Sequence, residues 1–108
     1  MIGRAGVEEI LTTYKKYGWI LRRVLLTKNS LSSLQSTKDL FGEVPISESD
    51  VDALWFSRPN KKGRVAWEIR HLSETPYALL EMIDEDDADL EAVLSSIQSR
   101  LKENVWRK

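Results

Sequence analysis

The chain has 108 residues, of which 42% are hydrophobic and 31% are charged, and it contains no cysteine. This composition is typical of one globular domain, and it excludes a disordered chain, a disulfide scaffold, a zinc–thiolate site and a cysteine nucleophile. No apolar run approaches the roughly 20 residues of a membrane span, and residues 1–10 lack a basic-then-apolar leader, so we expect a single cytoplasmic α+β domain over residues 1–108.

The net charge of −1 is unevenly distributed along the chain. Residues 1–40 are predominantly basic, whereas residues 84–91 hold six acids and no base. A near-neutral total argues against a dedicated nucleic-acid binder, although a local basic patch is compatible with it. The acidic run does not have the spacing of an EF-hand loop, and acids in the first turn of a helix are explained by the helix dipole, so we predict no metal site.

The N-terminal third predicts a helix followed by a strand. Residues 6–17 place apolar side chains on one helical face, and Gly18 follows where a left-handed cap is favoured. Residues 19–27 are rich in strand-forming residues, but their alternation is poor because both sides carry apolar side chains and an arginine. A strand that is apolar on both sides is usually central in its sheet or covered on both faces. Residues 31–42 predict a further short helix.

Residues 52–84 contain three strand-like runs separated by two turn signals, PNKKG and SETP. The middle run alternates strictly between apolar and mostly polar residues, which is the period of a half-buried strand. The last part of the chain predicts a long helix, whose apolar stripe is formed by Leu90, Val93, Leu94, Ile97, Leu101 and Val105.

This order predicts an α+β fold with a single four-stranded, mostly antiparallel sheet, made of one strand followed by a three-strand meander. The simplest packing places the N- and C-terminal helices together on one face of that sheet. The sequence therefore predicts one covered face and one outer face.

The turn signals predict which residues pair across the meander. With Pro59 and Gly63 inside the first turn, Trp55 pairs with Trp67, and closure at SETP pairs Trp67 with Met82. The predicted core face then consists of Val51, Ala53, Trp55, Val65, Trp67, Ile69, Ala78, Leu80 and Met82.

The opposite face carries more large apolar side chains than an outward sheet face normally needs. Its main members are Leu54, Phe56, Tyr77 and Leu79. A contiguous apolar patch often marks an interaction surface, so these residues predict a site for a protein partner or for homodimerisation. The alternative is that residues 31–46 fold across this face, and the sequence leaves both interpretations open.

A second hypothesis is binding of nucleic acid or another polyanion through the hairpin at residues 58–64. The candidate residues are Arg58, Lys61, Lys62, Arg64 and Arg70. Cations beside aromatic side chains suit a surface that follows phosphates and stacks bases. The alternative is an ordinary solvated hairpin tip, where lysines also discourage edge pairing.

Catalysis has the least support in the sequence. His71 is the one histidine, and the predicted register places it on the core face as a packing residue; a shifted register would bring Asp52 opposite it. No phosphate loop, nucleophile elbow or metalloprotease motif is present, so we predict no catalytic residue and no cofactor. The favoured function is a small non-catalytic protein-interaction module, with polyanion binding as the alternative.

Overall fold

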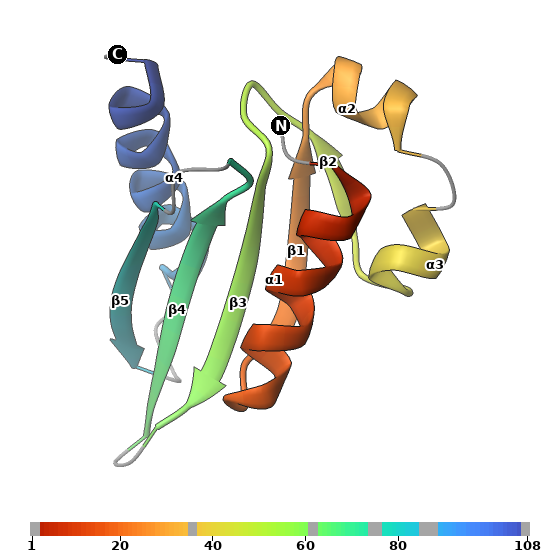
Figure 1. Ribbon diagram of the computed structural model, residues 1–108. Coiled ribbons are helices and arrows are strands. Elements are labelled where there is room, and N and C mark those ends of the chain that lie inside the picture. Colours follow the sequence, from red (N-terminus) through yellow and green to blue (C-terminus); the bar gives the residue numbers. More distant parts are fainter. Residues whose placement is uncertain (1–2, 35–36, 61–62, 74–76, 85–88, 107–108) are drawn as a thin grey trace.

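The computed structural model describes residues 3–34, 37–60, 63–73, 77–84 and 89–106. A helix and a strand are followed by two short helices, a short strand, a three-strand meander and a long helix (Figure 1). The elements are α1 (Arg4–Lys16), β1 (Ile20–Leu26), α2 (Lys28–Ser33), α3 (Thr37–Phe41), β2 (Ile46–Glu48), β3 (Ala53–Pro59), β4 (Arg64–His71), β5 (Ala78–Asp84) and α4 (Leu90–Trp106).

The strands form one mixed sheet in the order β2-β1-β3-β4-β5. Every pairing is antiparallel except that of β1 with β2, which is parallel. The α+β class and the single, largely antiparallel sheet are confirmed. The predicted count of four strands omits β2, whose three residues follow Pro45 and are too few to show a period.

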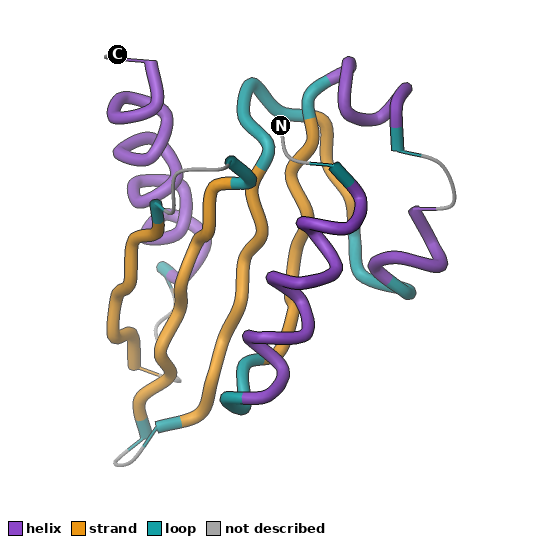
Figure 2. Tube along the Cα trace, viewed as in Figure 1, coloured by secondary structure: helices purple, strands orange, loops and turns teal. Residues whose placement is uncertain are grey.

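The helices cover opposite faces of the sheet, as Figure 1 and the trace in Figure 2 show. The side chains of α1, α2 and α3 share one core cluster with Leu54 and Phe56, whereas those of α4 share another with Trp55 and Ile69. The prediction that both terminal helices pack on one face is therefore wrong. The physical reason is β3, whose residues from Ala53 to Ser57 are all buried, so that the strand needs cover on both sides.

A β-bulge explains the poor alternation of β1. Leu21 pairs with Phe56 and Arg23 pairs with Trp55, which leaves Arg22 as the extra residue. Because of this insertion, Arg22 and Arg23 both point toward the α4 side: the first donates to Ser57 Oγ (2.7 Å) and the second contacts Glu91.

Beyond the bulge, β1 alternates regularly. Val24 and Leu26 lie in the α1 cluster, and Leu25 lies in the α4 cluster. The two adjacent arginines therefore occupy one side of the sheet, and each side of β1 keeps the apolar residues that its covering helix needs.

The hairpin between β3 and β4 is shifted by two residues from the predicted register. Trp55 pairs with Ile69, and Pro59 is the last residue of β3 rather than part of the turn. The turn begins at Asn60, whose N–H donates to the Arg64 carbonyl (2.9 Å), and Gly63 adopts the expected positive φ of 69°. A shift of two residues preserves the faces, so the predicted sides of these two strands are correct.

The pairing of β4 with β5 differs by one residue, and this changes the faces. Ile69 pairs with Leu79, whereas the predicted closure pairs it with Leu80. A one-residue slip moves every side chain of a strand to the other face. Leu79 and Ile83 consequently contact the α4 cluster, and Ala78, Leu80 and Met82 lie on the α1 side; the predicted core positions of these last three residues are wrong.

The ends of α1 and α2 are fixed by local hydrogen bonds. Gly18 has φ 87° and donates its N–H to the Lys15 carbonyl (3.1 Å), as the sequence predicts for a left-handed residue after the helix. Thr27 is the N-cap of α2, and its Oγ1 accepts from the Ser30 N–H (3.3 Å).

These burial differences predict how two leucines on the same side of the sheet contribute to stability. Leu54 is 0% exposed and Leu80 is 51% exposed. Leu54→Ala should lower the free energy of unfolding by about 2–5 kcal/mol because it leaves a cavity beneath α1. Leu80→Ala is the matched control and should change it by less than about 0.5 kcal/mol. Urea unfolding measures both, and equal losses would contradict the assigned faces.

Candidate functional site

The four residues predicted to form an outer apolar patch lie on different sides of the sheet. Leu54 and Phe56 are buried, at 0% and 1% exposure, beneath α1, so the expectation that they face outward is wrong. Tyr77 and Leu79 are half-buried and pack against the α4 cluster. The four do not form one surface.

Two segments cover Leu54 and Phe56. The ring of Tyr14 in α1 stacks on Phe56, with centroids 4.0 Å apart and planes inclined by 12°. Leu34 and Phe41 from the segment after β1 are buried in the same cluster. The alternative that residues 31–46 cross this face is therefore correct in part, and α1 supplies the rest of the cover.

The basic residues of the hairpin make contacts within the chain. Arg58 lies over the Trp19 ring (4.8 Å to the centroid) and donates to the Tyr17 carbonyl (3.0 Å). Arg64 pairs with Asp84 (3.5 Å), and Arg70 donates to the His71 carbonyl. Lys61 and Lys62 lie outside the described residues.

His71 and Asp52 do not form the carboxylate–imidazole pair that the shifted register predicted. His71 pairs with Ala53 across the sheet. Asp52 instead accepts from Thr27, through Oδ1 to the backbone N (2.8 Å) and to Oγ1 (3.2 Å). Asp52 therefore holds the start of α2 against the start of β3.

The α1 side of the sheet is covered only in part. Helix α1 lies over β1 and β3, and the same side of β4 and β5 carries no helix among the described residues (Figure 1). Leu80 (51% exposed) and Met82 (36% exposed) lie there. We call this region the open surface; its side chains are Arg64, Glu68, Arg70, Ala78, Leu80, Met82 and Asp84.

The border of the open surface is a hydrogen bond between α1 and β4. The Tyr14 hydroxyl reaches past Phe56 and donates to Glu68 Oε2. Burial raises the pKa of Tyr14 well above its usual value, and the Glu68 carboxylate raises it further. A hollow of about 390 Å³ runs along this border, lined by Gly6, Glu9, Ile10, Thr13, Tyr14, Arg70 and Ser73.

The outer limit of the open surface is β5, the strand at the end of the sheet. On its α4 side, a shallow groove of about 470 Å³ separates β5 from the outer flank of α4. The groove is lined by Glu81, Ala92, Val93, Ser96, Ile97 and Arg100. One ion pair crosses it, between Arg100 and Glu81 (3.4 Å). Apolar side chains therefore flank the β5 edge on both sides of the sheet.

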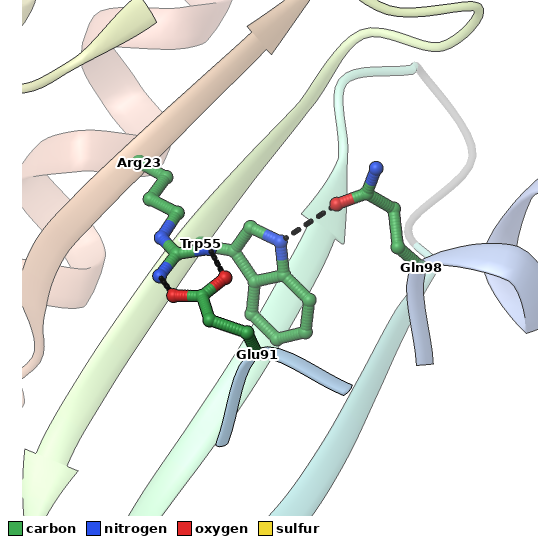
Figure 3. Close-up of polar contacts among 4 residues, drawn as sticks. All are labelled: Arg23, Trp55, Glu91 and Gln98. Atoms are coloured by element: carbon green, nitrogen blue, oxygen red, sulfur yellow. Dashed lines mark hydrogen bonds and ion pairs between the residues drawn. The ribbon is translucent and has the colours of Figure 1, made fainter. Parts of the chain in front are cut away.

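A polar cleft of about 440 Å³ lies at the other end of the α4 side. Beside it, as Figure 3 shows, Arg23 binds Glu91 through both terminal guanidinium nitrogens, and the Trp55 indole N–H donates to Gln98 Oε1 (3.2 Å). The Arg23 guanidinium lowers the pKa of Glu91, chiefly through this hydrogen bonding.

The described side chains leave no buried polar atom without a hydrogen-bond partner. The polar groups drawn in Figure 3 are thus already paired with one another across β1, β3 and α4. Their contacts attach α4 to the sheet, so the cleft has a sufficient structural explanation.

Two further kinds of site are absent from the described ranges. No group of three or more histidine, cysteine or carboxylate side chains is placed to hold a metal ion, although residues 85–88 of the acidic run lie outside these ranges. None of the described helices combines the length and apolar character needed to cross a membrane.

Comparison with protein-family models, with curated proteins and with solved structures gives no match. The proposals below therefore rest on the residues of this chain alone.

The Arg23–Glu91 contact predicts a titration that can be followed by NMR of the side-chain carboxyl carbons. The pKa of Glu91 should lie below its usual range, and Arg23→Gln or high salt should return it toward that range. Because the pKa is depressed in the folded state, the pair stabilises the protein above the ordinary carboxylate pKa and loses this effect as the pH falls. An unchanged Glu91 pKa in Arg23→Gln would contradict the contact.

The raised pKa of Tyr14 predicts the opposite pH dependence. The pKa of the Tyr14 phenol is higher in the folded chain than in the unfolded chain. Its contribution to the free energy of unfolding is therefore complete below pH about 10, and it decreases as the pH rises further. The difference in unfolding free energy between the parent chain and Tyr14→Phe should therefore shrink above pH about 10. Urea unfolding at several alkaline pH values measures it; a constant difference would show that the hydroxyl is not held by burial and Glu68.

Proposed function

We propose that this chain is a small non-catalytic protein-interaction module that binds its partner through the open surface and the β5 edge. The observation that carries the proposal is the exposure of Leu80 and Met82 on the strand that ends the sheet. Exposed apolar side chains beside an unpaired strand edge are what a partner needs in order to add a strand and bury them. We further propose that the module acts in the cytoplasm, as expected from the sequence.

The backbone of β5 supports strand addition. The His71 N–H donates to the Tyr77 carbonyl (2.9 Å), so these two residues form a hydrogen-bonded pair and Tyr77 directs its backbone groups toward β4. Backbone direction alternates along a strand. Ala78, Leu80 and Met82 therefore direct their N–H and C=O groups away from β4, into the space that a new strand would occupy.

The charges of the open surface favour a protein partner over a polyanion. Arg64 is paired with Asp84, and Glu68 lies between Arg64 and Arg70 on the same side of β4. A surface of alternating charges has no uniform positive potential for a phosphate backbone to follow. The same charges suit the polar rim of a protein interface around Leu80 and Met82.

Affinity capture of the tagged protein from its own cells, with and without nuclease, tests this function. Leu80→Lys places a charge in the centre of the open surface and should abolish recovery of protein partners, because a lysine there has to be desolvated in the complex. Ile20→Lys is the matched control, since Ile20 is similarly exposed (43%) but lies on β1 near Ser57, away from β5. Circular dichroism should show both variants folded.

The outcomes of the capture experiment distinguish binding of a protein partner from binding of a polyanion. Nuclease-resistant partners that are lost with Leu80→Lys and kept with Ile20→Lys support the proposal. Recovery that disappears with nuclease supports polyanion binding instead, and recovery unaffected by Leu80→Lys refutes the assigned surface.

A further inference from the structure

We infer that a second copy of this chain is a partner for the β5 edge: the two β5 strands pair antiparallel around a two-fold axis that passes beside Leu80. This inference rests on the proposed function and names its partner. Pairing in this way joins the two five-stranded sheets into one continuous sheet.

The symmetry of the proposed pair limits which β5 residues can face each other. A two-fold axis perpendicular to the sheet keeps the open surfaces of both copies on the same side, so residues whose side chains lie on the open surface must oppose one another. These are also the residues whose N–H and C=O groups point outward, Ala78, Leu80 and Met82. Any register in which these residues exchange backbone hydrogen bonds therefore also keeps their side chains together on the open surface.

Charge distinguishes the register with Glu81 on the axis from the register with Leu80 on the axis. If Glu81 lay on the axis, the two Glu81 carboxylates would face each other as a directly opposed like-charged pair, which destabilises a sheet. Moving the axis to Leu80 removes this conflict, because Glu81 then opposes Leu79 of the second copy. In this register Leu80 opposes its own equivalent and Ala78 opposes Met82.

The proposed pairing buries apolar side chains of both copies. On the open surface, the register brings together the exposed apolar side chains of both copies, Leu80 and Met82. On the α4 side, the groove lined by Ala92, Val93 and Ile97 borders the joined strands in each copy. Three hydrogen-bonded residue pairs, with about six backbone hydrogen bonds, complete the contact.

The charges near the joined strands are compatible with self-association. Glu81 pairs with Arg100 of its own copy (3.4 Å), and this exposed contact lessens but does not remove the repulsion between two directly opposed Glu81 carboxylates. The net charge of −1 per chain adds little repulsion between the two copies.

Sedimentation equilibrium over a range of concentrations tests the association. The full chain should show a monomer–dimer equilibrium, and Leu80→Lys should weaken it by about 100-fold because two apolar contacts are lost and two lysines face each other on the axis. Ile20→Lys should leave the equilibrium unchanged. Unfolding curves for both variants exclude loss of the fold as the cause.

Spin labels test the register, and the absence of native cysteine makes single-site labelling simple. With the axis at Leu80, Ala78→Cys and Met82→Cys are each offset from their equivalents by four residues, or about 13 Å along the strand, so the two label distances should be equal. With the axis at Glu81 the offsets become about 20 Å for position 78 and about 7 Å for position 82.

The sedimentation experiment tests the dimer, and the label distances test its register. A concentration-dependent dimer that is sensitive to Leu80→Lys, with equal label distances, supports the inference. Unequal distances overturn the register, and a monomer at all concentrations overturns the dimer. A monomer whose capture of other proteins is still abolished by Leu80→Lys leaves the proposed function intact, which distinguishes the two failures.

Discussion

The constraint on which the structure depends is the burial of the first five residues of β3. Five consecutive side chains of this strand, from Ala53 to Ser57, are inaccessible to solvent, and they point alternately to the two faces of the sheet. Neither face can therefore remain solvated at the centre of the sheet, because the large apolar side chains of Trp55 and Phe56 lie on opposite sides. The placement of α1 on one face and α4 on the other follows from this requirement.

Helices α1 and α4 cover unequal parts of the sheet. Helix α4 packs against β4 and β5 as well as Trp55, whereas α1 covers β1 and β3 and is attached to β4 only at its margin, through Tyr14 and Glu68. The face beneath α1 is consequently covered by α1, α2 and α3 on one part of the sheet, while β4 and β5 carry no helix on that side among the described residues. The proposed interaction site is this remaining part of the face.

Much of this arrangement was predictable from periodicity. The long helices, the strand after α1, the meander and the apolar stripe of α4 all follow from residue spacing, and their positions agree with the structure. The two-sided apolar character of the strand 19–27 also indicated double cover, but the predicted packing of both helices on one face did not use it. Strand β2 was not predictable in this way, because its pairing with Val24 is a tertiary contact of a three-residue segment.

The candidate site was predicted less well, for two physical reasons. Leu54 and Phe56 were assigned to an outer face because both terminal helices were expected on the other face, whereas α1 covers these two residues. The observed pairing of β4 with β5 differs by one residue from the pairing predicted from closure at SETP, whose residues 74–76 lie outside the described residues. This difference exchanges Leu79 with Leu80 between core and surface. The structure therefore exposes Leu80 and Met82 on the sheet, whereas the sequence predicted an outer apolar patch at Leu54, Phe56, Tyr77 and Leu79.

The short parallel strand β2 has a consequence for assembly. At that end of the sheet only Ile46–Glu48 are available, and the preceding Pro45 has no N–H to offer an incoming strand. The sheet thus has one long edge at β5, where the proposed pairing takes place, and one short edge at β2. If two copies pair through β5, each molecule uses its long edge in that one contact, so the proposed assembly is a closed pair that does not propagate into a fibre.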